Sequence, residues 1–368
     1  MHILKLTYTI VMIAGCYRPQ SWTSLFKRTL YNIYSLYVIG ILYMFSFLQF
    51  MDIIINVDNT DDFTSTLNLM LTTSVACYKT FIMWLNYENI VALINYLTEE
   101  PFKPLDSDEI KIRQQYDNII RNNTLCYTIL IVGSYAFAVL ASLFTHFRYK
   151  RLKYREWIPY DYSSNVIYCF TYIQQMLGGY HCVITNVAID SLMCALLMHI
   201  CCQIDILEYR LKKLLSNHLT VGYCVRHHNR IFEFAQIVNI KFTKIIGFQF
   251  LASMMITCSN LYQVAKSTLN TDHIALIMFT SCMLTEIFIY CWFGNKVKLK
   301  SLQVTDTIFQ MEWPMLGNSV KKSLLMIMKR AMIPIEVTTV YILTMNLDSF
   351  VMFLKTSYSI YNLLTQVK

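Results

Sequence analysis

The sequence predicts an all-α membrane protein with seven transmembrane helices. Its 368 residues are 55% hydrophobic and only 15% charged, with a mean hydropathy of +0.41, unlike an ordinary soluble domain. Apolar runs of about 20 residues, the length that crosses a bilayer as a helix, recur along the chain. The nine Gly and six Pro are too few for a β-rich or loop-rich fold.

Charge and motifs exclude several classes of function. The net charge of +8 comes from basic residues in short runs between apolar segments, which is typical of cytoplasmic loops and does not indicate a nucleic-acid partner. The twelve Cys contain no CxxC pair and lie mostly within or beside apolar runs, as buried side chains do. The HExxH, Walker, GxSxG and GxGxxG motifs are absent, and the His residues lack metal-ligand spacing. We therefore expect no enzyme activity, no catalytic or metal site and no cofactor.

The first apolar run, residues 3–16, is too short to span a bilayer and is interrupted by Lys5 and Thr7. We interpret it as an uncleaved segment at the inner membrane interface. Seven longer runs follow, of which the fourth and seventh exceed the bilayer thickness. The predicted spans run near Thr29–Met51, Phe63–Asn86, Leu125–Phe147, Val166–Cys202, Phe242–Ala265, His273–Gly294 and Glu336–Gln366.

The distribution of Lys and Arg predicts the orientation in the membrane. With the N-terminus inside, most basic residues of the connecting segments fall on the cytoplasmic side, as the positive-inside rule requires. A basic run at 148–155 is an exception on the outer side. Seven spans then place the C-terminus outside, the opposite of a G-protein-coupled receptor.

Two segments outside the predicted spans have apolar stripes at helical spacing. Residues 202–241 connect the fourth and fifth spans, and residues 301–332 connect the sixth and seventh. A helix that is apolar on one face outside the membrane needs a partner. We therefore expect these segments to form a cytoplasmic helical bundle.

The last predicted span combines an apolar composition with polar residues. Asp348, Lys355 and the run Thr356–Ser359 would be costly facing lipid, so they should face protein or a water-filled path. One interpretation is a pore-lining helix with a hydrophobic constriction. The other is a helix packed in a bundle, and from these residues alone the second is favoured.

Four motifs change that balance, because they resemble those of insect odorant receptors. The C-terminal run SFVMFLKTSYSIYNLL (349–364) is similar to the family's C-terminal signature, and CWFGN (291–295) to the end of its sixth span. The segment KKSLLMIMKRAMIPIEVT (321–338), which follows Trp313, resembles the link between the family's last two spans. GCYRPQSW (15–22) resembles its GCWRPxSW opening. The resemblance covers the whole chain.

The resemblance implies an odorant-gated, non-selective cation channel. Family members form tetramers in which a tuning receptor assembles with a shared co-receptor. The short link between spans four and five lacks the co-receptor's long insertion, so the chain looks like a tuning subunit. By this resemblance, residues 1–300 hold six spans, an outer ligand cavity and cytoplasmic extensions, residues 301–335 a cytoplasmic anchor helix, and residues 336–368 the pore-lining seventh helix.

The resemblance also places a ligand cavity in the outer half of the bundle, between spans two, three, four and six. The Met and aromatic residues in the outer half of these four spans suit a small, volatile, weakly polar organic ligand. Core packing is the alternative interpretation for each residue there. The candidate ligand contacts are Met70, Thr73, Ser74, Phe137, Leu140, Phe144, Tyr168, Tyr172, Met176, Phe279 and Met283.

The channel gate is expected near the outer end of the seventh span. The family closes its pore with two aliphatic rings four residues apart, and matching the C-terminal ends places them at Leu363 and Val367. The candidate pore and gate residues are Thr356, Ser359, Ile360, Leu363, Gln366 and Val367.

We therefore expect an odorant receptor in the plasma membrane of sensory neurons, whose partners are the co-receptor, a volatile ligand, membrane lipids and permeating cations. A gustatory-type channel is an alternative, although its TYxxxxxQF run is poorly matched by residues 340–350. A G-protein-coupled receptor is another, against which stand the predicted orientation and the lack of DRY-like and NPxxY-like motifs. A transporter is a third, but no inverted repeat is apparent.

Overall fold

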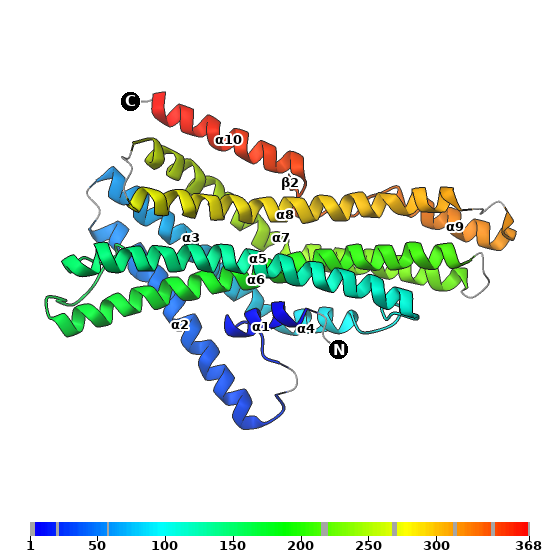
Figure 1. Cartoon of the computed structure of the whole chain (residues 1–368), viewed down its shortest axis with the longest axis horizontal. Coiled ribbons are helices and arrows are strands. Elements are labelled where there is room, and N and C mark those ends of the chain that lie inside the picture. Colours follow the sequence, from blue (N-terminus) through cyan, green and yellow to red (C-terminus); the bar gives the residue numbers. More distant parts are fainter. Residues whose placement is uncertain are drawn as a thin grey trace.

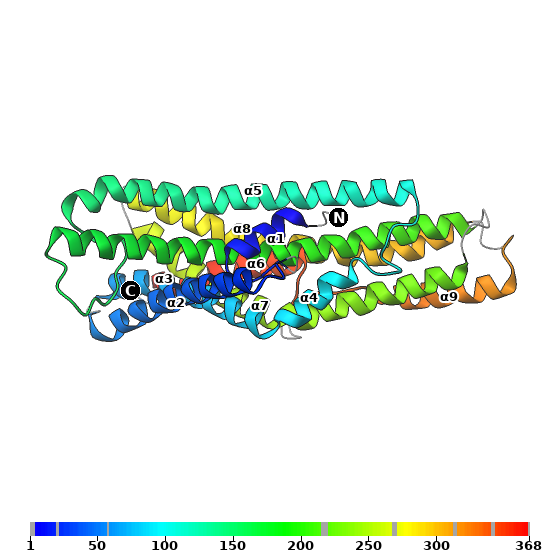
Figure 2. The ribbon, with the colours of Figure 1, turned by 90° about the horizontal axis from the view of Figure 1, so that it is seen from below.

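The computed structural model describes residues 4–19, 22–56, 59–214, 220–266, 271–311, 315–339 and 343–366. Its helices form an elongated bundle in which α5, α6, α7 and α8 run along the long axis, α2 crosses at a tilt, and α10 lies along one side (Figures 1 and 2). The elements are α1 (Lys5–Ile13), α2 (Leu25–Ile55), α3 (Thr60–Leu85), α4 (Tyr87–Tyr96), α5 (Ser107–Thr145), a 3₁₀ turn (Phe147–Tyr149), α6 (Asn165–Lys213), α7 (Val221–Lys266), α8 (Thr271–Gln310), α9 (Asn318–Ala331), β1 (Thr338–Thr339), β2 (Leu343–Thr344) and α10 (Leu347–Gln366).

Helix α6 forms the centre of the bundle. Its most apolar stretch is completely buried, and it packs against α1, α2, α3, α5, α7 and α8. Helix α6 also carries buried polar side chains, including Thr185, Asp190 and Ser191, which would be costly facing lipid, and this accounts for its central position. The predicted interfacial segment forms α1, which packs against α6 and α5 with Val11 buried.

Seven helices correspond to the seven predicted spans. Five of them, α2, α5, α6, α7 and α8, are long and apolar enough to cross a membrane by length and composition. Helices α3 and α10 complete the set and carry more polar residues within their length. Helices α5, α6, α7 and α8 also continue far beyond the predicted span boundaries, because their extensions keep a helical apolar stripe.

The predicted start of the seventh span at Glu336 is wrong. The chain first forms a short antiparallel hairpin, in which Thr338 pairs with Thr344 and Thr339 with Leu343. The strand residues Thr338, Thr339 and Thr344 are β-branched, and such residues favour extended backbone. Helix α10 begins only at Leu347, where the Asn346 Oδ1 accepts a hydrogen bond from the Ser349 N–H at 2.8 Å and caps the first turn.

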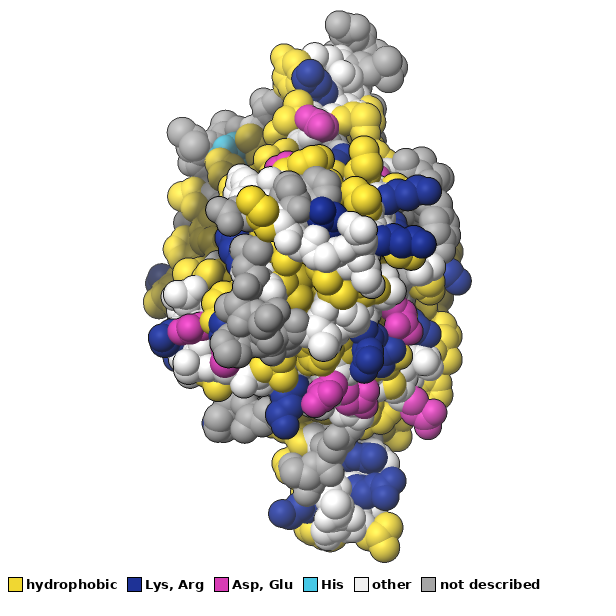
Figure 3. Space-filling view, turned by 90° about the vertical axis from the view of Figure 1, so that its right-hand side faces the viewer, with side chains coloured by type: hydrophobic (Ala, Val, Ile, Leu, Met, Phe, Trp, Pro, Cys, Tyr) yellow, Lys and Arg dark blue, Asp and Glu magenta, His cyan; other side chains and the backbone are white. Residues whose placement is uncertain are grey.

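The helix extensions gather at one end of the molecule, on the right of Figure 1. Seen from that end, Lys and Arg side chains form several clusters on the surface (Figure 3). Inside, Arg210 is fully buried and its guanidinium donates two hydrogen bonds to the Glu109 carboxylate, at 2.8 and 2.7 Å. The apolar stripes of the 202–241 segment, including Leu207, Leu211 and Phe234, are buried in the same region.

The predicted anchor segment 301–335 is not a single helix. Helix α8 continues through Gln310, and the separate helix α9 begins at Asn318 and packs against α7 and α8. One face of α9 is buried, with Leu324 and Ile327 almost inaccessible. The opposite face exposes Leu325 and Met326, at 50% and 64% of their surface.

Candidate functional site

A cavity of about 670 Å³ lies among α3, α5, α6, α7 and α8, toward the end of the bundle where α5 ends and α6 begins. This volume suits a small organic molecule. The loop between α5 and α6 reaches the cavity through Lys153, Tyr154 and Arg155 and covers it from that end. Hydrogen bonds hold the loop in place, since both the N–H and the C=O of Tyr154 bond to the Gln175 amide of α6.

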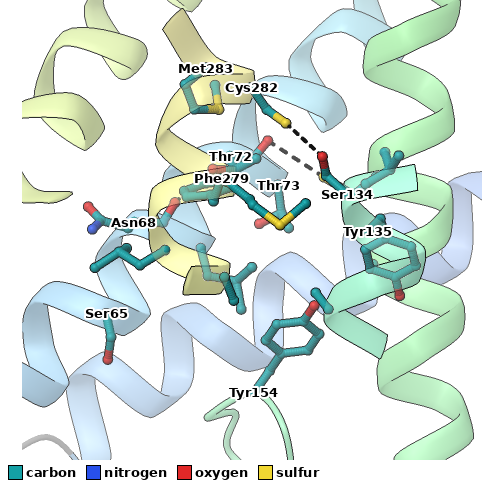
Figure 4. Close-up of a pocket in the computed structure, with 18 of the residues that line it drawn as sticks. Ser65, Asn68, Thr72, Thr73, Ser134, Tyr135, Tyr154, Phe279, Cys282 and Met283 are labelled. Carbon is teal, nitrogen blue, oxygen red and sulfur yellow. Dashed lines mark hydrogen bonds between the residues drawn. The ribbon is translucent and has the colours of Figure 1, made fainter. Parts of the chain in front are cut away.

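The walls of the cavity combine apolar and polar side chains (Figure 4). Helix α3 contributes a polar row that includes Asn68, Thr72 and Thr73, while α8 contributes Phe279 and Met283. Helix α5 faces them across the cavity. The lining residues of α5 are Tyr127, Ile131, Ser134, Tyr135 and Ala138.

Three of the eleven candidate ligand contacts, Thr73, Phe279 and Met283, line this cavity. On α5 the candidates occupy a different face, because Phe137, Leu140 and Phe144 are exposed on the outside of the bundle. The central part of α5 is apolar on most sides, so its sequence does not indicate which face points inward.

The remaining candidates pack near the cavity without lining it. The hydroxyl groups of Tyr172 and Ser142 are 2.7 Å apart, and Tyr168 donates to the Arg151 carbonyl. The Met176 carbonyl accepts a hydrogen bond from the Tyr135 hydroxyl at 2.6 Å. The other two candidates, on α3, are Met70 and Ser74, which are only partly buried.

A buried charged cluster borders the cavity through Glu286 and Tyr127, which line it. Lys79 of α3 lies 2.6 Å from the Asp190 carboxylate of α6 and 2.8 Å from the Glu286 carboxylate of α8. The Tyr127 hydroxyl donates to Asp190 at 3.1 Å, and the Tyr290 hydroxyl donates to the same carboxylate. Charges buried at this depth need such partners, and the cluster ties four helices together. Sequence reasoning missed it, although charged residues inside three predicted spans were a visible signal.

Up to Asn362, where its side chains are described, helix α10 packs against α7 and α8 through one face. The Phe353 ring lies 5.1 Å from that of Phe250 on α7, and the Phe350 ring lies 5.3 Å from that of Phe288 on α8. On the other side, the candidate pore residues Ser359 and Ile360 are exposed, and Thr356 is half-buried.

The three candidates nearest the C-terminus have no described side chain. Leu363 and Gln366 belong to the last turns of α10, but their side chains lie outside the described part of the structure. Val367 lies outside the described residues altogether. The position of the gate therefore stays a prediction.

Residues 59–358 match the sequence model of the family described as 7tm Odorant receptor. The chain belongs to this odorant receptor family. It is 27% identical to odorant receptor 46a, isoform A, of Drosophila melanogaster, over 74% of this chain and 76% of that relative. It is 24% identical to putative odorant receptor 85d of the same species, although that match spans only 54% of the relative's length.

Solved structures show the same fold. The insect olfactory receptor OR5 from Machilis hrabei, in a structure with eugenol, superposes with a TM-score of 0.89, covering 100% of this chain and 99% of that one at 17% identity. A second structure of OR5 gives a TM-score of 0.90 at 16% identity. The odorant receptor described here is therefore a multi-pass membrane protein with the fold of seven transmembrane helices. Membership of a receptor family also agrees with the lack of catalytic motifs in its sequence.

Proposed function

We propose that this odorant receptor is the tuning subunit of an odorant-gated, non-selective cation channel that assembles with a shared co-receptor. The observation that carries the proposal is that one helix, α8, both lines a cavity of suitable size and packs against α10. Phe279 and Met283 line the cavity, and Phe288, further along α8, packs against Phe350 of α10.

A second contact joins α8 to the chain just before α10. Gly294 lies so close to Met345 that a Cβ atom on the glycine would clash with the Met345 backbone. A ligand that binds better when α8 adopts one of two positions would therefore also bias the position of α10. Such differential binding is the thermodynamic requirement for gating.

The exposed face of α10 is proposed to line the pore once subunits assemble. That face carries Met352, Ser359 and Ile360, and its continuation by one or two turns reaches Leu363 and Val367. Aliphatic rings at these two positions would exclude water and so block ions in the closed state. Gln366 would lie beside them at the mouth of the pore.

Assembly with the co-receptor is proposed to use the end of the molecule that holds α9. The exposed apolar side chains Leu325 and Met326 form a surface that a second subunit can cover. The subunit would reside in the plasma membrane of sensory neurons, contacting lipids and permeating cations.

Orientation is part of the proposal, with the N-terminus cytoplasmic and the C-terminus outside. An N-terminal tag should then be inaccessible to antibody on intact cells, while a tag after Lys368 should be accessible. The reverse staining would favour a G-protein-coupled receptor instead.

The functional test is to record currents from cells that express this chain with and without the co-receptor, across an odorant panel. We expect odorant-evoked current only when both are present. Phe279→Ala and Met283→Ala, which alter the cavity, should change the half-maximal odorant concentration several-fold. Leu140→Ala should leave it unchanged, because this side chain faces outward and is 56% exposed. Equal effects of all three variants would contradict the assignment of the cavity.

A further inference from the structure

Two buried asparagines lie side by side in the wall of the cavity, Asn68 on α3 and Asn260 on α7. They are 5% and 0% exposed. The Asn68 Nδ2 donates to the Asn260 Oδ1 at 2.9 Å and to the Ser259 Oγ at 2.9 Å. Within the described residues, the Asn68 Oδ1 and the Asn260 Nδ2 have no hydrogen-bond partner. The pair thus keeps one free acceptor and one free donor.

This result does not depend on how each amide is oriented. The bond between the two side chains requires a nitrogen on one and an oxygen on the other. Rotating both amides by 180° exchanges the roles and again leaves one donor and one acceptor without a partner.

Three other hydroxyl groups in the wall, those of Thr72, Thr73 and Ser134, differ from the pair because they already donate to protein atoms. The Thr72 hydroxyl donates to the Asn68 carbonyl at 2.9 Å, and the Thr73 hydroxyl to the Gln49 Oε1 at 2.9 Å. Across the cavity, the Ser134 hydroxyl donates to the Leu130 carbonyl at 2.7 Å. These groups gain little from a polar ligand, whereas a buried amide oxygen or nitrogen that lacks a partner carries an unrelieved desolvation cost.

We propose that the Asn68–Asn260 pair makes the cavity selective for ligands with a hydroxyl group on an apolar skeleton. This inference rests on the proposed function, since it takes the cavity as the odorant site. A hydroxyl group donates one hydrogen bond and accepts another, and so satisfies both free groups of the pair. An ether satisfies only the donor, and a hydrocarbon satisfies neither. The apolar side chains Phe279 and Met283 surround the rest of the ligand.

The test uses matched probes of nearly equal size: 2-phenylethanol, its methyl ether and propylbenzene, with 1-octanol and nonane as a linear set. Binding is measured as thermal stabilisation of the purified receptor complex, and currents are recorded in parallel. We expect the wild type to bind each alcohol about tenfold more tightly than the matched hydrocarbon, with the ether between them.

The double variant Asn68→Leu, Asn260→Leu should abolish this preference, because no unmatched amide remains. Thr72→Val is the matched control, since it removes a hydroxyl from the same wall without removing a free partner, and it should keep the preference. If the double variant does not fold, Asn260→Asp replaces the free donor by an oxygen. It should then bind the ether no better than the hydrocarbon.

Each outcome of these experiments either supports or overturns the inference. Equal binding of alcohol and hydrocarbon by the wild type, an unchanged preference in the variants, or no binding of any probe would overturn the inference. Alcohol-selective stabilisation that depends on the pair but gates no current would support the inference and overturn the channel function instead.

Discussion

At the scale of single residues, Glu156 is an unusual feature of the loop that covers the cavity. Its side chain is 7% exposed, and neither carboxylate oxygen has a hydrogen-bond partner among the described residues. The charged groups nearby are Asp52 on α2, Asp62 on α3 and Arg155 in the loop, and Arg155 pairs with both aspartates. Burial raises the pKa of Glu156 to about 7, the Gln175 amide opposes the rise, and the Asp52 carboxylate adds to it.

The sign of the resulting pH dependence follows from this raised pKa. Between its ordinary value of 4.5 and about 7, the folded protein holds a proton on Glu156 that the unfolded chain has lost. Stability should therefore decrease as the pH rises through this window, by up to about 3 kcal/mol from this group.

We predict that Glu156→Gln raises the unfolding temperature at pH 8 and has little effect near pH 4.5. The measurement is thermal unfolding of the purified protein across that range. A variant whose stability parallels that of the wild type at every pH would show that Glu156 is not buried as described.

At the scale of helices, the sequence predicted well those features that depend on apolar length, and poorly those that depend on a difference between the faces of a helix. Apolar length predicted seven long helices, and the structure has a helix for each, although the last begins at Leu347 and not at Glu336. The resemblance implied the depth of the cavity but not the inward face of α5, and Phe137 and Leu140, which were expected at the cavity, face outward. Thr73, Phe279 and Met283 line the cavity, and their contact with ligand stays a prediction. The amide pair depends on contacts between α3 and α7 that one sequence cannot show.

Helix α9 gives a prediction for assembly. Leu325 is half exposed, so Leu325→Asp should leave the subunit folded but place an unpaired charge in the proposed interface, at a cost of several kcal/mol. Co-purification with the co-receptor should be lost. Ser319→Asp, an exposed position on the same helix, is the control and should assemble normally. Normal yield of the Leu325→Asp complex would place the interface elsewhere.

Phe234 is not a suitable position for testing assembly, although it lies in an apolar stripe of the 202–241 segment. It is 1% exposed and its ring lies 5.6 Å from that of Phe102 within the chain. Phe234→Asp should therefore reduce the amount of folded protein itself, which would hide any effect on assembly.

At the scale of the whole molecule, three regions follow one another along the bundle. The cavity lies near one end, the charged cluster of Lys79, Asp190 and Glu286 borders it through Glu286, and the helix extensions with α9 form the other end. Helix α10 lies along the side of this bundle and exposes the face opposite Phe353. Among the described residues of a single subunit, nothing packs on that face of α10. In a tetramer around a central pore, it would face the pore or a neighbouring subunit.

The most direct test of this account is whether the end of α10 controls the ion path. Leu363→Ala and Val367→Ala should each weaken the hydrophobic barrier, raising the odorant-free current several-fold or altering ion selectivity. Leu364→Ala is the matched control and should affect packing alone. Because the co-receptor could mask one altered subunit, the recordings should be repeated with its matching gate residues changed. Currents indistinguishable from wild type in basal level, selectivity and block would contradict the claim that this chain lines the pore.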